Sequence, residues 1–227
     1  ANGGEAVHGL TQFADITPEE FRRTYLGSIR PEGDNQAILT SVPPLEEGLH
    51  ASKDWTGSLT TPVKNQGSCG SCWAFSAAEQ IESDTMRTLG VSYVLSPQQL
   101  VSCDNTSFGC DGGWTEHAYN YVKRAGGIEQ NSDYPYTSPP TGTCQANSSK
   151  FKVAVDAYYT ISGESSMANH MTSTGPLSVC LDASTWSSYT GGIMTNCPKQ
   201  VNHCVQAVGV DTSSAWKVNL NSTVFFF

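Results

Sequence analysis

The sequence predicts an α+β protein whose helices come first and whose strands follow. Capped, helix-type patterns occur up to about residue 125, and strand-type patterns occur after residue 151. A chain of 227 residues is long enough to bury a sizeable core in each of two lobes. We therefore expect one helical half and one half rich in strands, packed against each other.

Three helices are predicted with clear starts and stops. A helix begins at Thr17-Pro18, where a capping residue, a proline and two glutamates stand in the preferred order. A long, largely buried helix begins near Ser71 and runs to Leu89-Gly90, where glycine ends it. A shorter helix opens at Ser96-Pro97, with a glutamine in the capping-box position.

A fourth helix and the strands complete the pattern. Residues 114–125 are helical in pattern and are followed by two glycines. Alternating apolar residues occupy 153–159, and apolar strand-type runs occupy 177–181 and 205–210. The polar, proline-containing stretch from about 27 to 48 has the composition of an extended linker.

Composition narrows the function classes. The formal net charge is −9, which argues against a nucleic-acid-binding protein because such proteins show basic clusters. No apolar run approaches the roughly 18–20 residues of a membrane-spanning helix. Eight cysteines fit an oxidising compartment, although a reduced protein with scattered thiols stays possible on the count alone.

One cysteine and one histidine stand where nucleophilic catalysis would need them. Cys72 lies in the first turn of the predicted long helix, where free N–H groups and the helix dipole favour a thiolate. His203 stands at the start of an apolar strand, which suits a fixed imidazole. Taken singly, such a histidine is more often structural, and such a cysteine is more often disulfide-bonded or inert.

The residues around Cys72 resemble the active-site segment of papain-like cysteine proteases. The segment reads Gln66-Gly-Ser-Cys-Gly-Ser-Cys72-Trp-Ala-Phe-Ser76, and His203 follows Cys72 by 131 residues, within the family's interval of about 130–150. Further stretches are similar to the same family, in its cathepsin L-like branch: 54–55, 62–65, 95–104, 109–113, 134–136 and 175–179. The resemblance implies a two-lobed fold, a helical lobe with a long central helix, and a β-rich lobe.

The resemblance also implies a role for each matching residue. Cys72 would attack a peptide carbonyl to form a thioester, and His203 would form an ion pair with it and protonate the leaving amine. Gln66 would donate a hydrogen bond to the oxyanion. Gly112 and Gly113 would present a backbone edge with which substrate pairs as an added strand. The positions that match the family's pocket for the second residue before the scissile bond are Trp114, Cys180, Val201 and Cys204, and Asn202 is a further substrate-binding candidate.

The residue that should orient the histidine departs from the family pattern. The family places an asparagine four residues after an aromatic, in an Asn-Ser-Trp-Gly run, but this chain reads Trp216-Lys-Val-Asn219-Leu-Asn221-Ser-Thr. Asn219 is one residue early and Asn221 one residue late. Either could reach His203 if the strand register allows it, and we favour Asn221.

Three disulfides are expected. Cys69–Cys110 and Cys103–Cys144 match two disulfides of the family. Cys180 and Cys204 are additional cysteines at the two pocket positions, and we expect them to bond to each other if they lie on neighbouring strands. Cys72 would remain a free thiol, and Cys197 would lack its usual partner.

The resemblance divides the chain into two regions. Residues 1–47 are similar to the end of an inhibitory propeptide plus a linker, and 48–227 to the peptidase domain, with a helical lobe at about 57–150 and a β lobe at about 151–227. Both ends look truncated, so the β lobe is expected to be incomplete. The partners implied are polypeptide substrates and the chain's own propeptide, with no cofactor and no metal. A monomer in a lysosome, a vacuole or the extracellular space is expected.

Two other interpretations compete with an active endopeptidase. An inactive papain-like homologue or a non-functional fragment would explain the altered asparagine motif. A zinc module would use Cys69 and Cys72 as half of a ligand set, with Cys103 and Cys110 as the other half, although their spacing fits poorly.

Overall fold

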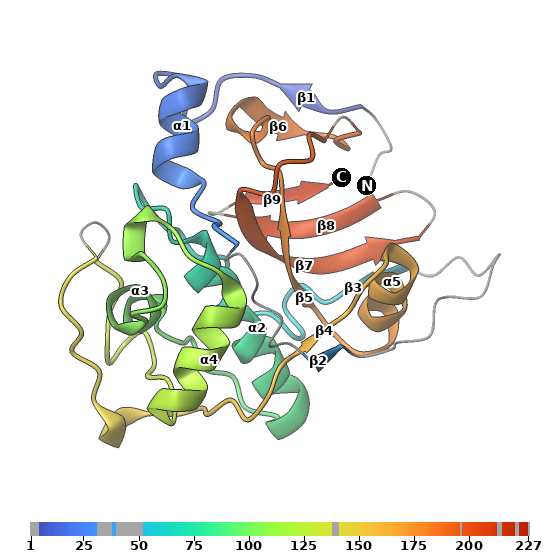
Figure 1. Cartoon of the computed structure of the whole chain (residues 1–227). Helices are drawn as coiled ribbons and strands as arrows, with labels where there is room; N and C mark the ends of the chain where they lie inside the picture. The colour runs from blue at the N-terminus through green and yellow to red at the C-terminus, as the bar shows by residue number, and fades with distance from the viewer. Residues whose placement is uncertain are drawn as a thin grey trace.

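The structure is a computed structural model that describes residues 5–30, 38–39, 52–137, 141–195, 197–212, 215–220 and 223–226. Figure 1 shows a group of helices in one part of the molecule and a curved sheet, with a further helix beside it, in the other, while the N-terminal residues lie across both. The predicted α+β class is therefore confirmed. The expected domain boundary near residue 47 falls outside the described residues.

Three helices build the helical part: α2 (Cys72–Leu89), α3 (Pro97–Cys103) and α4 (Thr115–Ala125). Helix α2 is central, and its first residues are almost completely buried among apolar side chains from α3 and α4. Gly90 adopts a left-handed conformation with φ of 68° and ends α2. The Ser96 side chain caps α3 by accepting a hydrogen bond from the Gln99 backbone. Each helix lies where its cap pattern predicted it.

The sheet has five antiparallel strands with β7 (His203–Asp211) in the middle. On one side of β7, β5 (Leu177–Leu181) pairs with its first half and β3 (Ser52–Asp54) with its second half. On the other side lie β8 (Ala215–Leu220) and then β9 (Thr223–Phe226). The predicted strands at 177–181 and 205–210 are thus confirmed.

Helix α5 (Glu164–Ser173), which the sequence analysis did not predict, covers one face of this sheet (Figure 1). Its Met171 is fully buried against Val205, Ala207 and Val218 from the sheet. The sheet therefore has a second core of its own, separate from the core around α2.

The alternating residues 153–159 do not form the strand that their pattern favours. Only Tyr159–Thr160 is a strand (β4), paired in parallel with β2 (Ile38–Leu39), and Val153 makes a single bridge to Ile128. Val153 and Val155 are half-buried against the helical core. The alternation therefore reflects an extended chain that lies over the helices and is not part of the sheet.

The N-terminal residues pack mainly on the sheet side. Strand β1 (Val7–His8) pairs with β6 (Tyr189–Gly191), which follows the short helix η3 (Trp186–Ser188). Helix α1 (Pro18–Tyr25) begins with the predicted capping box, in which Thr17 and Glu20 exchange hydrogen bonds.

Two short 3-10 turns, η1 (Gly109–Asp111) and η2 (Ser148–Lys150), complete the described elements. None of the described helices is long and apolar enough to cross a membrane.

Candidate active site

Residues 25–30 run between the helical part and the sheet and are hydrogen-bonded to both (Figure 1). On the helical side, the Gly113 N–H donates to the Gly27 carbonyl and the Ile29 N–H donates to the Gly113 carbonyl, both at 2.9 Å. On the sheet side, the Ser28 N–H donates to the Asn202 carbonyl at 3.0 Å. We call residues 25–30 the covering segment.

The helical side needs its two glycines. Gly112 has φ of 125°, and a Cβ built there would lie 2.7 Å from Ile29 Cδ1 and 2.8 Å from the Gly27 carbonyl oxygen. A Cβ on Gly113 would lie 2.6 Å from the Trp73 ring. Glycine at 112 therefore lets the covering segment approach this edge, whereas glycine at 113 avoids a clash within the helical part.

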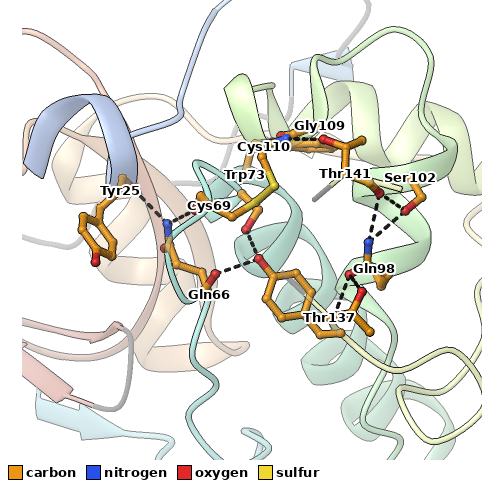
Figure 2. The surroundings of a disulfide bond; sticks show 12 residues. Tyr25, Gln66, Cys69, Trp73, Gln98, Ser102, Gly109, Cys110, Thr137 and Thr141 are labelled. Carbon is orange, nitrogen blue, oxygen red and sulfur yellow. Dashed lines mark hydrogen bonds between the residues drawn. A yellow bond between two sulfur atoms is a disulfide. The ribbon is translucent and has the colours of Figure 1, made fainter. Parts of the chain in front are cut away.

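The Gln66 side chain points its amide at the covering segment. Its Nε2 donates to the Tyr25 carbonyl at 2.9 Å and to the Cys69 carbonyl at 2.8 Å, and the side chain is 1% exposed (Figure 2). The Gln66 backbone is held in turn by the Tyr136 hydroxyl, which donates to its carbonyl at 2.7 Å. The amide is therefore a fixed donor directed at a main-chain carbonyl oxygen.

Cys72 is the first residue of α2 and is a free thiol. It is 1% exposed, and burial raises the pKa of the thiol, while backbone groups of Cys204 and Gly27 oppose the rise. The lowered pKa that we expected from the helix dipole is therefore wrong for this state. A site closed by the covering segment excludes water, and this loss of solvent outweighs the dipole.

His203 is the first residue of β7 and is also 1% exposed. Burial lowers the pKa of its imidazole to about 3, and the Tyr25 backbone opposes this shift. Neither ring nitrogen makes a hydrogen bond to another described residue. The ring packs edge-on against Trp186, with ring centroids 6.2 Å apart. A buried polar ring without a hydrogen-bond partner is uncommon, and a catalytic role is one of the accepted explanations.

The covering segment lies against both Cys72 and His203. The Gly27 backbone lies against the thiol, and the Tyr25 backbone lies against the imidazole. These two segment residues are two positions apart, a span of at most about 7 Å. In this closed state burial favours a neutral thiol and a neutral ring, so the predicted ion pair is disfavoured while the segment is in place.

Of the two candidate asparagines, the structure describes only Asn219. Asn219 is buried, and it pairs with Gln206 in the β7–β8 ladder, three residues from His203. Because side chains alternate along a strand, Asn219 and His203 belong to opposite faces of the sheet. Asn221, the favoured candidate, lies outside the described residues.

Several of the predicted pocket residues contact the segment at residues 28–30. The Ser28 hydroxyl lies 3.1 Å from Cys204 Sγ, and the Arg30 guanidinium lies 5.8 Å from the centre of the Trp114 ring. Asn202 contacts Ser28 through its carbonyl only, because its side chain is hydrogen-bonded to Asp182. Val201 is 46% exposed.

All three expected disulfides are formed: Cys69–Cys110, Cys103–Cys144 and Cys180–Cys204. Cys72 and Cys197 are free among the described residues. The zinc interpretation is wrong, because three of its four cysteines are bonded to other cysteines and cannot act as thiolate ligands.

The covering segment does not follow from the sequence pattern. The composition after residue 27 predicts a linker, whereas Tyr25, Gly27 and Ser28 make the contacts described above. Gly27 is the residue in the sequence that could have indicated this segment. A Cβ there would lie 1.9 Å from the Gly70 carbonyl oxygen, so this glycine is a point of close backbone approach and not a flexible joint.

A family model described as papain family cysteine protease matches residues 49–222. The chain belongs to the papain family. Among relatives, cysteine proteinase 1 of Zea mays is 35% identical over 241 residues, covering 97% of this chain and 64% of the relative. Cathepsin L 2 of Paramecium tetraurelia is 37% identical over 214 residues, covering 92% of this chain and 66% of the relative. The chain thus spans just under two thirds of these papain-family relatives.

Solved structures of papain-family precursors have the same fold. The digestive procathepsin L2 proteinase from Tenebrio molitor larval midgut superposes with a TM-score of 0.87 at 32% identity, covering 97% of this chain and 78% of that one. A recombinant stem bromelain precursor gives a TM-score of 0.76 at 31% identity, covering 97% of this chain and 73% of that one. The papain-like two-lobed fold expected from the sequence is therefore confirmed.

Proposed function

We propose that this chain is the larger part of a cysteine endopeptidase precursor that cleaves polypeptides through Cys72 and His203. The observation that carries the proposal is convergence on one segment: the Gln66 amide, the Cys72 thiol and the His203 ring all meet residues 25–27. The Tyr25 carbonyl, bonded to Gln66, occupies the place where a scissile carbonyl would be polarised.

Residues 1–47 act in this proposal as the inhibitory propeptide and linker, and 48–227 as the peptidase domain. While the covering segment is in place, it fills the backbone edge at Gly113 and keeps both reactive groups dry and neutral. Its removal would admit water, raise the pKa of His203 and lower that of Cys72, so that a thiolate–imidazolium pair can form.

The catalytic steps then follow from the residues. The Cys72 thiolate adds to the peptide carbonyl, and Gln66 and the backbone N–H of Cys72 stabilise the oxyanion. His203 donates its proton to the leaving amine, and water hydrolyses the thioester. Three disulfides and the cathepsin-type relatives support a secretory, lysosomal or vacuolar location.

The test is hydrolysis of a denatured protein and of peptide amides by the full-length precursor after maturation at acid pH. We expect activity that Cys72→Ala and His203→Ala abolish and that a metal chelator leaves unchanged. Activity that survives Cys72→Ala would overturn the proposal. A folded, matured protein with no activity would instead establish the inactive homologue.

A further inference from the structure

The Cys180–Cys204 disulfide lies directly beneath a buried side chain of the covering segment. Ser28 is 9% exposed, and its hydroxyl oxygen lies 3.1 Å from Cys204 Sγ. This distance is contact between an oxygen and a sulfur, so no further atom fits between them. The disulfide is therefore the floor of the space that the Ser28 side chain occupies, which we call the Ser28 subsite.

The main chain of Ser28 is held from both sides by other main chain. Ser28 forms a parallel bridge with Gly113 on one side and donates its N–H to the Asn202 carbonyl on the other. Main-chain bonds of this kind hold any polypeptide in the same way, whatever its side chains. A substrate residue that pairs with Gly113 and Asn202 would direct its side chain to the same floor.

The floor is fixed in position. Cys180 and Cys204 face each other in the β5–β7 ladder, and hydrogen-bonded strand pairs continue on both sides, at Val179–Val205 and Leu181–His203. Cys204 is 2% exposed, so it is packed from below as well. A larger side chain cannot push the sulfur atoms down without moving two paired strands, one of which carries His203.

We propose that the Cys180–Cys204 disulfide restricts the Ser28 subsite to small side chains, such as glycine, alanine and serine. As a statement about substrates, this inference rests on the proposed function. Its physical content is a size limit, which can be measured on the chain itself without any catalysis.

The first test uses the covering segment as the ligand, in a Cys197→Ser background that leaves Cys72 as the free thiol. The measurement is the rate of Cys72 alkylation by iodoacetamide. Ser28→Ala fits the space and should keep the slow rate of the parent chain. Ser28→Leu overfills the space and should raise the rate at least tenfold by displacing the segment.

Removing the floor should reverse that effect. In a Cys180→Ala, Cys204→Ala chain, the leucine gains the volume of the two sulfur atoms, and the slow rate should return. Fast alkylation of Ser28→Leu both with and without the disulfide would overturn the proposal, and so would slow alkylation of Ser28→Leu with the disulfide intact. Circular dichroism of each variant identifies any chain that has not folded.

A second measurement does not need the disulfide variant. The matured full-length enzyme is given peptides that differ only at the residue opposite the Ser28 subsite. We expect kcat/KM to be at least tenfold higher for alanine or serine than for leucine or phenylalanine. Equal or reversed values in an active enzyme would overturn the size limit and leave the proposed function standing, whereas absence of activity towards every peptide would count against the proposed function alone.

Discussion

The two walls that hold the covering segment are built differently. On the helical wall, Gln66 and Gly113 lie on loops that are joined by the Cys69–Cys110 disulfide, and the loop between those cysteines spans 41 residues. On the sheet wall, Asn202 and Cys204 lie at the start of a strand whose position is fixed by hydrogen bonds to β5 and β8.

The two disulfides, Cys69–Cys110 and Cys180–Cys204, therefore have different roles in this molecule. In a chain-entropy account, closing loops of 41 and 24 residues differs by only about 0.5 kcal/mol, so both disulfides should stabilise the fold similarly. Locally they differ. We expect the helical wall to depend on its disulfide for shape, because its residues lie on loops, whereas the sheet wall should keep its register without Cys180–Cys204.

The largest effect is expected on the helical wall at Gln66. Replacing Gln66 by alanine removes a fixed donor to the oxyanion and should lower kcat/KM of the matured enzyme by about 10²–10³. Gln200→Ala is the matched control, because its side chain is exposed. A loss of less than threefold in steady-state hydrolysis would show that Gln66 does not act on the oxyanion.

Removal of single disulfides tests the comparison directly. Cys69→Ala, Cys110→Ala and Cys180→Ala, Cys204→Ala chains should each lose about 2–4 kcal/mol in urea unfolding. Only the first pair should also raise the alkylation rate of Cys72 in the folded chain, since only the helical wall loses its shape. Equal alkylation rates in the two chains would remove the distinction between the walls.

Gly27→Ala should displace the covering segment without changing any residue of either wall. The added methyl would meet the Gly70 carbonyl oxygen at 1.9 Å, and backbone cannot move aside cheaply. The rate of Cys72 alkylation, measured by mass spectrometry, should rise about tenfold or more. A steric clash of a few kcal/mol shifts the equilibrium between the closed and open positions of the covering segment by at least this factor. The control is Gly191→Ala, where nothing lies within 4 Å of an added Cβ. An unchanged rate for Gly27→Ala would mean that the segment does not cover the thiol.

A smaller, pH-dependent effect on the free energy of unfolding is expected from Glu79, which lies where the helical part meets the sheet. Burial raises the pKa of this carboxyl from 4.5 to about 7, although Lys64 opposes the rise. The folded chain therefore holds a proton that the unfolded chain releases, so Glu79 favours folding below about pH 4.5 and loses this contribution as pH rises through 7. Glu79→Gln should reduce the fall in unfolding free energy between pH 4.5 and 7.

Urea unfolding at the two pH values measures this, with the exposed Asp156→Asn as control. The raised pKa of Glu79 would be contradicted if the wild-type chain became more stable between pH 4.5 and 7 and Glu79→Gln made that gain smaller.

Local chemistry made most of the fold predictable. Thr17 and Ser96 cap helices because their side chains bond to the next turn, and this requires only neighbouring residues. The five-residue strand at 177–181 follows from its apolar run. The alternating pattern at 153–159 wrongly predicted a strand. An extended chain that lies over helices buries alternate residues in the same way as a strand in a sheet.

Long-range pairing limited the prediction of the site. The Asn219 position depends on the β7–β8 register, which includes a bulge between Ala207 and Gly209 and cannot be counted from the sequence. The covering segment was missed because its partners Gln66, Gly113 and Asn202 are 41 or more residues away. The disulfide pairing was predictable because the resemblance implied two of the pairs, and the expectation that Cys180 and Cys204 lie on neighbouring strands implied the third.

The central claim is that Cys72 is a reactive nucleophile hidden by residues 25–30. The most direct test is mass spectrometry of the full-length precursor treated with a peptidyl epoxide, before and after maturation at acid pH, with Cys72→Ala as control. We predict a single adduct on Cys72 after maturation and none before. Labelling of Cys72 at equal rates in both states, or no labelling of the folded, matured protein, would contradict it.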